Sequence, residues 1–337
     1  MAIQAPQARY VTGLSGTLIQ CLLCPRNCRI PAGARGKCGV RENRDGAGLL
    51  PYYGAVTALA LDPIEKKPLY HYRPGSSICS VGFTGCNLHC PFCQNWRISQ
   101  HADAPARYLS PAEVIRKAQS AGSAQIAYTY SEPLVHTEFL LDCMSLARKA
   151  GIANVLISNG CAGPGPREAV LRLTDAANID LKCCSEETYT RVLGGDLPAV
   201  IGFINRAWEM GVHLEVTTLV IPGLNDGGEE IRRCIDLIRG ISPHIPWHLS
   251  AYHPDYRWNA PPTDPARLAS IADRAREALS YVYTGNIPGE INDTSCVHCG
   301  RRLVRRLGYR IDTGGLELKG TAYYCAHCGN AAPFRYA

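Results

Sequence analysis

Three cysteines with a CxxxCxxC spacing, Cys86, Cys90 and Cys93, are the residues of this chain best suited to chemistry. Three thiolates can bind a [4Fe–4S] cluster and leave one of its irons open to a further ligand. A closed structural site has four protein ligands, whereas a site that reacts keeps one coordination position free. The spacing therefore predicts a [4Fe–4S] cluster with an open iron. A tetrahedral zinc site that takes its fourth ligand from elsewhere in the chain is the alternative.

Two CxxCG motifs near the C-terminus supply a second group of potential metal ligands, Cys296, Cys299, Cys325 and Cys328. Two such motifs can hold a metal tetrahedrally, and the glycine permits the turn that directs backbone N–H groups at sulfur. They predict a zinc-ribbon module. A rubredoxin-type iron site uses the same geometry and is the alternative.

Four further cysteines lie near the N-terminus, in a segment broken by glycine and proline: Cys21, Cys24, Cys28 and Cys38. The segment has too little apolar area to fold alone, and a bound metal would supply the missing folding energy. Zinc and an auxiliary iron–sulfur cluster both accept four thiolates, so both remain open. Reduced cysteines without a metal are a further alternative.

The composition indicates a large protein of a reducing compartment. The chain has 337 residues, 17 of them cysteine, and a formal net charge of +6. Cysteines clustered at two-residue spacings suit metal binding in a reducing cytosol better than disulfides. No stretch approaches the roughly 20 apolar residues that span a bilayer, and the start of the chain lacks a signal pattern. We therefore expect a cytoplasmic protein without a membrane partner.

The elements that must position the CxxxCxxC motif follow an alternating strand and helix pattern. Helices are expected from Ser110, as an N-cap, and over 134–150 and 263–281. Repeated units of this kind predict an α/β fold, a partial (β/α)6-type TIM barrel with functional residues at the carboxyl ends of its strands. Six apolar runs are the expected strands: 78–83, 125–130, 154–158, 177–181, 214–221 and 247–252.

Three domains follow from these patterns. Residues 1–50 form the N-terminal four-cysteine module, and residues 51–290 form the barrel core. Residues 291–337 form the zinc-ribbon or rubredoxin-like module.

The CxxxCxxC motif, with Phe92 just before its last cysteine and an apolar strand in front of it, resembles the signature of the radical S-adenosylmethionine (SAM) superfamily. The resemblance implies that the open iron binds the amino and carboxylate groups of SAM. It also implies that an external electron donor reduces the cluster. Cleavage of SAM then gives methionine and a 5′-deoxyadenosyl radical, which abstracts hydrogen from a substrate.

Polar residues at the strand ends would then face SAM. Superfamily members usually show Gly-Gly-Glu-Pro where this chain has residues 130–133, so the resemblance implies that Glu132 binds the ammonium of SAM. Each of these residues also has a structural alternative. Glu132 could be an acid at the N-terminus of a helix, Asp180 and Lys182 could form only a salt bridge, and His253 could be purely structural. Lys182 and His253 are also candidates for catalysis. The residues interpreted as cofactor-binding are Phe92, Ser131, Glu132, Asn159, Asp180, Lys182 and His253.

A finer resemblance covers nearly the whole chain. The strand-end residues are similar to the branch that contains pyruvate formate-lyase activating enzymes. The segments 21–28, 36–43, 62–71 and 85–99 resemble the AmmeMemoRadiSam system radical SAM enzymes. This resemblance implies Memo-like and Ammecr-like protein partners, but it does not imply a substrate.

Three other functions are alternatives to hydrogen abstraction from an unidentified substrate. Activation of a glycyl radical enzyme requires a protein substrate whose glycine loop reaches the cleft. Modification of RNA would use a run of arginines as a track for RNA phosphates, although such a run of charges is usually just a solvated face. A non-catalytic electron-transfer or scaffold protein belongs to another class. The arginines of the possible track are Arg301, Arg302, Arg305 and Arg306.

Overall fold

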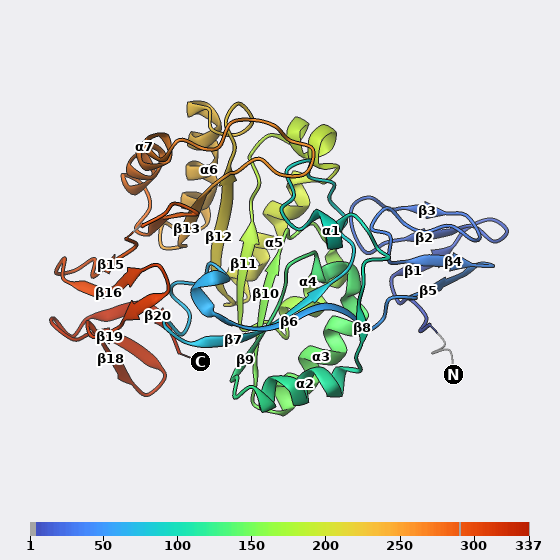
Figure 1. Cartoon of the computed structure of the whole chain (residues 1–337), viewed down its shortest axis with the longest axis horizontal. Coiled ribbons are helices and arrows are strands. Elements are labelled where there is room, and N and C mark those ends of the chain that lie inside the picture. The colour runs from blue at the N-terminus through green and yellow to red at the C-terminus, as the bar shows by residue number, and fades with distance from the viewer. Residues whose placement is uncertain (1–4, 290, 337) are drawn as a thin grey trace.

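The computed structural model describes residues 5–289 and 291–336, and a curved nine-stranded sheet forms its centre (Figure 1). Within these residues seven strands run parallel, in the spatial order in which they follow along the chain, and two antiparallel strands add to one edge. The predicted α/β fold with parallel strands is confirmed. The parallel strands are β7 (Ser77–Phe83), β9 (Gln125–Thr129), β10 (Ala153–Ser158), β11 (Ala176–Asp180), β12 (His213–Val220), β13 (Trp247–Ala251) and β14 (Val282–Gly285).

Helices lie outside the curved sheet and pack on it through apolar side chains (Figure 1). Ser110 caps the first long helix as predicted, since its hydroxyl accepts from the backbone N–H of Glu113 at 3.3 Å. Shorter segments are α1 (Trp96–Ser99), the 3₁₀ turns η1 (Ile64–Lys66) and η2 (Pro133–His136), and the π-helix η3 (Thr188–Leu193). The longer helices are α2 (Pro111–Ser120), α3 (Thr137–Lys149), α4 (Pro164–Leu171), α5 (Leu197–Glu209), α6 (Gly228–Ile241) and α7 (Pro265–Arg276).

Two helices are shorter than predicted. Glu132 accepts from the N–H of Leu134 and caps the turn η2, so α3 begins only at Thr137. Asp264 caps α7, which ends at Arg276 rather than continuing to residue 281. Both caps satisfy N–H groups that a helix leaves without partners at its start.

Strands β6 (Ala55–Pro63) and β14 were not predicted. β6 runs antiparallel to β7, with β8 (Arg107–Tyr108) outside it. Leu59 and Leu61 of β6 are exposed, as expected of a strand near a sheet edge. At the end of β6 the chain turns through η1, and residues 62–71, which contain this turn, contribute to the lining of the barrel interior.

Small antiparallel sheets flank the barrel on opposite sides, the N-terminal ones in blue and the C-terminal ones in red (Figure 1). The N-terminal strands are β1 (Val11–Gly13), β2 (Ile19–Cys21), β3 (Arg29–Ile30), β4 (Glu42–Arg44) and β5 (Ala47–Leu49). The C-terminal strands are β15 (Thr294–Ser295), β16 (Arg302–Leu307), β17 (Arg310–Asp312), β18 (Leu316–Lys319), β19 (Ala322–Cys325) and β20 (Ala331–Arg335). Among the described residues, no helix is both long and apolar enough to cross a bilayer.

Candidate active site

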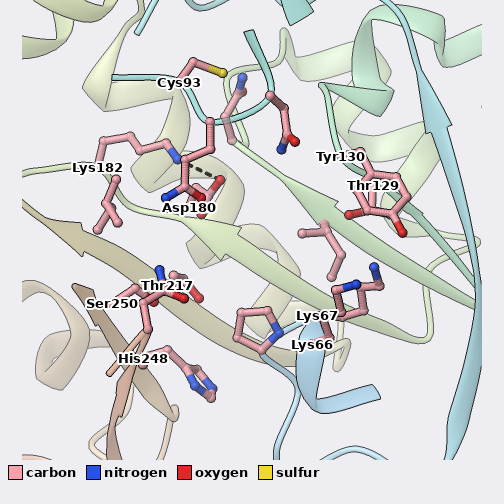
Figure 2. Close-up of a pocket in the computed structure, with 18 of the residues that line it drawn as sticks. Lys66, Lys67, Cys93, Thr129, Tyr130, Asp180, Lys182, Thr217, His248 and Ser250 are labelled. Carbon is pink, nitrogen blue, oxygen red and sulfur yellow. Dashed lines mark ion pairs between the residues drawn. The ribbon is translucent and has the colours of Figure 1, made fainter. Parts of the chain in front are cut away.

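A cavity of about 820 Å³ occupies the interior of the barrel. Figure 2 shows Cys93, Asp180 and Lys182 at one end of it, with Lys66, Lys67 and His248 at the other. The first end is formed by loops that follow the carboxyl ends of β7, β10 and β11. This is where functional residues of parallel barrels gather.

The three cysteines of the CxxxCxxC motif line this end. The backbone N–H of Leu88 donates to Cys86 Sγ at 3.3 Å, and Cys93 Sγ lies 3.2 Å from Ser99 Oγ. Burial raises the pKa of Cys86 well above its usual range and that of Cys90 to about 12. Both thiols therefore stay protonated at neutral pH unless a metal displaces the proton.

The sulfurs of these thiols are not arranged around a single ion. Tetrahedral thiolates on one zinc lie about 3.8 Å apart, given Zn–S bonds of about 2.3 Å. The sulfurs of Cys86, Cys90 and Cys93 do not all lie within 4.8 Å of one another. They are also the cysteines among the described lining residues, so an iron left without a thiolate would face the cavity.

Glu132 links the end of β9 to the end of β10. Its carboxylate accepts from Ser158 Oγ at 2.7 Å, the N–H of Asn159 at 2.8 Å and the N–H of Leu134 at 3.0 Å. Burial raises the pKa of Glu132 to about 7, against the opposing effect of these donors. A carboxylate has about four lone-pair positions, so one more donor can still bind.

Ser131 and Asn159 also line the cavity and support the cysteine loop. Ser131 Oγ donates to the carbonyl of Phe83 at 3.0 Å. Asn159 Nδ2 lies 3.7 Å from Cys86 Sγ and donates to Asn87 Oδ1 at 3.0 Å. Both residues therefore hold the loop in place as well as facing the cavity.

Asp180 and Lys182 point to the same side of the chain, as the strand alternation predicts, and form an ion pair of 2.8 Å (Figure 2). Burial lowers the pKa of Lys182, but the negative charges of Asp180 and of Cys90 in its thiolate form more than offset it, so the pKa is raised. Lys182 is therefore a fixed cation beside the cysteine loop.

The remaining two predicted cofactor residues differ in their placement. Phe92 is buried, lines the cavity and packs edge-on against Trp258 at 6.4 Å. His253 is exposed, and its Nε2 lies 3.3 Å from the carbonyl of Asn286. The structure does not place His253 in the cavity lining, because the chain leaves β13 after Ala251 and turns outward.

The end of the cavity at Lys66, Lys67 and His248, the lower end in Figure 2, contains polar residues that were not predicted. Lys66 and Lys67 both pair with Asp62, at 3.0 Å and 2.8 Å. Lys67 also lies 4.4 Å from the ring centroid of Tyr130, whose hydroxyl donates to Asp62 at 2.6 Å. Thr217 Oγ1 is buried in the lining without a hydrogen-bond partner among the described residues. Side chains alternate between the two faces of a strand, and this alternation along β12 and β13 could have placed Thr217, His248 and Ser250 on the cavity side.

Glu215 anchors residues 62–71 from inside the barrel. Its fully buried carboxylate accepts from the N–H groups of Tyr70 at 3.0 Å and His71 at 2.7 Å. It also accepts from Nε2 of His213 at 2.9 Å and of His248 at 2.6 Å. Burial raises the pKa of Glu215, but these donors outweigh it, so the pKa lies well below its usual range.

The C-terminal cysteines form a tetrahedral arrangement. All four sulfurs lie within 4.8 Å of one another. The pairs Cys296–Cys328 and Cys299–Cys325 are each 3.8 Å apart, which matches the spacing around one zinc or iron. The group could therefore bind one metal ion.

We expect Cys299→Ser to remove this metal, because a hydroxyl replaces one of four thiolates in an exposed site. Metal analysis of the purified full chain should show about one fewer zinc or iron per chain. Acid-labile sulfide should be unchanged, since a single-ion site contains none. Retention of the ion in the variant would contradict this assignment.

The possible phosphate track of four arginines is not formed. Arg306 is buried, and its guanidinium donates to the carbonyl of Tyr70 and to Thr294 Oγ1, both at 2.7 Å. Alternation along β16 turns Arg306 inward while Arg305 is exposed. Arg306 thus fastens the C-terminal strands to the barrel.

Comparison with known proteins agrees with this geometry. The model of the Radical SAM superfamily matches residues 80–238. The chain is 36% identical to an uncharacterized protein of Methanocaldococcus jannaschii, MJ0808, over 96% of this chain and 97% of that protein. It is 27% identical to the pyruvate formate-lyase-activating enzyme of Clostridium pasteurianum, over 51% of this chain and 74% of that enzyme. In fold it is similar to a radical SAM methyltransferase from Sphaerobacter thermophilus, with a TM-score of 0.50, 15% identity and coverage of 63% and 66%.

Proposed function

Since the chain belongs to the radical SAM superfamily and to one family with MJ0808, we propose that it cleaves SAM reductively and abstracts a hydrogen atom from a substrate in the barrel. The chemistry that a [4Fe–4S] cluster and SAM supply when bound is one-electron cleavage to methionine and a 5′-deoxyadenosyl radical. The observation that carries the proposal is the trio of Cys86, Cys90 and Cys93 at one end of a polar cavity.

Residues of this chain are placed to hold SAM beside the cysteine loop. The carboxylate of Glu132 offers an acceptor for the amino group of SAM, and the ammonium of Lys182 offers a partner for its carboxylate. Phe92 supplies an apolar surface at the same end. Hydrogen abstraction converts the radical to 5′-deoxyadenosine, so anaerobic protein reconstituted with iron and sulfide should form this product from SAM and dithionite.

We expect the affinity for SAM to rise with pH through Glu132. The pKa of Glu132 is raised to about 7, so the carboxylate that accepts from the amino group of SAM is mostly protonated at pH 6 and mostly ionised at pH 8. The Kd of SAM for reconstituted protein should fall about tenfold over this range. Glu132→Gln should bind SAM more weakly and without this pH dependence.

Glu113→Gln is the matched control, because Glu113 caps α2 on the surface and does not line the cavity. The control should keep the wild-type profile. A wild-type Kd that does not change between pH 6 and pH 8 would exclude this role of Glu132.

The lower end of the cavity is the proposed substrate site. Its uncommitted polar groups include Thr217 Oγ1 and one oxygen of the buried Glu65, neither of which has a partner among the described residues. Buried polar atoms without partners are costly, and a polar substrate would satisfy them. This placement favours a compact, polar hydrogen donor within the barrel over RNA at the C-terminal strands.

Activation of a glycyl radical enzyme is the second candidate. Similarity to the Clostridium activating enzyme over about half of the chain favours it. A partner protein labelled with deuterated glycine would then transfer deuterium into 5′-deoxyadenosine. Label that remains entirely in the partner would exclude this activity.

The proposed partners are an external one-electron donor and, from the AmmeMemoRadiSam resemblance, Memo-like and Ammecr-like proteins. The cytoplasm is the proposed location, since the cysteines are free of disulfides. Anaerobic co-purification from cells tests the two protein partners directly.

A further inference from the structure

The four N-terminal cysteines converge on the side of their module that contacts the barrel. Cys21, Cys28 and Cys38 pack into an apolar cluster that includes Val135 of the barrel. Cys24 and Cys38 both lie near Cys21. These four cysteines do not line the cavity.

The spacing of their sulfurs differs from that of the C-terminal cysteines. The C-terminal sulfurs all lie within 4.8 Å of one another, as one tetrahedral ion requires, whereas those of Cys21, Cys24, Cys28 and Cys38 do not. Cys86, Cys90 and Cys93 likewise do not form a group within this distance. Neither set of sulfurs is therefore gathered around a single ion as the C-terminal sulfurs are.

Hydrogen-bond donors surround the N-terminal sulfurs. The backbone N–H groups of Leu23, Arg26 and Val40 face the sulfur two residues earlier, as Leu88 does at Cys86. N–H groups directed at sulfur stabilise metal-bound thiolates and tune the potential of a cluster.

Arg41 supplies a second, independent indication of an anionic group. It is 1% exposed, and its Nη2 pairs with Glu138. Its Nε and Nη1 have no hydrogen-bond partner among the described residues. Arg41 lies close to Cys21 and Cys38, so its unpaired donors are available to a thiolate-bound cluster there.

The N-terminal cysteines also contact the CxxxCxxC loop directly. A Cβ at Gly85 would meet the carbonyl oxygen of Cys38 at 2.5 Å, so this close approach requires glycine. Arg26 Nε donates to the carbonyl of Asn87 at 2.7 Å, and the Asn87 side chain bonds to Cys24. Asn87 thus stands between Cys24 and the adjacent Cys86.

We propose that Cys21, Cys24, Cys28 and Cys38 bind a second iron–sulfur cluster, which passes single electrons to the cluster at Cys86, Cys90 and Cys93. The relay rests on the proposed function. A low-potential external donor gives one electron to the N-terminal cluster. This cluster is reoxidised when the electron moves to the cluster at Cys86, Cys90 and Cys93, from which the electron goes to SAM and breaks a carbon–sulfur bond. Four thiolates leave no open iron, and the site lies outside the cavity, so electron transfer suits it better than substrate binding.

Removal of the CxxxCxxC thiols tests the site without reference to activity. The full-length variant Cys86→Ala/Cys90→Ala/Cys93→Ala, reconstituted with iron and sulfide, should retain about two or four sulfides per chain. Its reduced cluster should give an EPR signal that SAM does not alter. Absence of sulfide, or zinc bound to the N-terminal cysteines, would overturn the proposal. Wild-type protein that contains both clusters yet forms no 5′-deoxyadenosine would instead overturn the proposed function.

The relay is tested with two reductants. In Cys24→Ser/Cys28→Ser, 5′-deoxyadenosine formation driven by reduced flavodoxin should fall at least about tenfold. Formation driven by dithionite should persist, because this small reductant can enter the cavity. Cys184→Ala, outside both groups, should behave as wild type with either reductant. Equal losses with both reductants, or no loss with flavodoxin, would exclude the relay.

Discussion

Cys90→Ala is expected to abolish formation of 5′-deoxyadenosine from SAM. Loss of supporting residues around a metal typically costs 10–100-fold, and loss of one of three proposed cluster ligands should cost more. Cys90 is 8% exposed. The other cysteines among the described lining residues are Cys86 and Cys93, which belong to the same motif, so no further thiol of the lining could replace Cys90. Product formation should therefore fall by on the order of a hundredfold or more in an anaerobic assay with dithionite.

Cys143→Ala is the matched control for this experiment. Cys143 is equally a buried thiol, but it lies on α3 within the apolar core and does not line the cavity. The control should keep its sulfide content and its product formation. Wild-type activity in Cys90→Ala would remove the basis of the proposed function.

Glu215→Gln is expected to destabilise the whole barrel. The carboxylate accepts from four donors on β12, β13 and residues 70–71, and it is completely buried. An amide offers one oxygen and places an NH₂ group against N–H donors, so several buried groups lose their partner. Breaking one side of a buried charged network costs about 3–5 kcal/mol, which corresponds to a fall of roughly 10 °C in the unfolding temperature.

The effect of Glu215→Gln should also depend on pH. The folded pKa of Glu215 lies below its unfolded value, so the carboxylate stabilises the fold above the unfolded pKa of about 4.3. This stabilisation is lost as the pH falls through the folded pKa. The difference in unfolding temperature between variant and wild type should therefore narrow in acid.

Glu229→Gln is the control for Glu215→Gln. Glu229 pairs with Arg233 on the exposed face of α6, where water screens the charges. Its unfolding temperature should match that of wild type. A variant of Glu215 that unfolds at the wild-type temperature would show that the buried network is dispensable.

Much of the barrel could be predicted because its signals are local. Each of the six apolar runs forms a strand, since both faces of a parallel strand are covered and such strands are continuously hydrophobic. Ser110 caps a helix through the residue three positions later, which is also a local pattern. β6 was missed because its middle is exposed near a sheet edge and so lacks a continuous apolar run, and its neighbour in the sheet is set by pairing at a distance.

The candidate site divides in the same way. Phe92, Ser131, Glu132, Asn159, Asp180 and Lys182 reach the cavity because each lies in the cysteine loop or at a strand end. His253 does not, since the outward turn after β13 has no local signature. Lys66 and Lys67 line the cavity only because Glu215, about 150 residues away in the chain, holds the following segment in the barrel.

By itself the sequence determined the alternating strands and helices and the three groups of cysteines, because periodicity and ligand spacing are properties of neighbouring residues. Only the tertiary structure decided which sulfurs approach one another closely and that the N-terminal cysteines contact the CxxxCxxC loop. It also decided that Arg306 is buried rather than exposed. Those features depend on which distant segments pack together, and the free energy of packing is a sum over contacts that no single stretch of sequence contains.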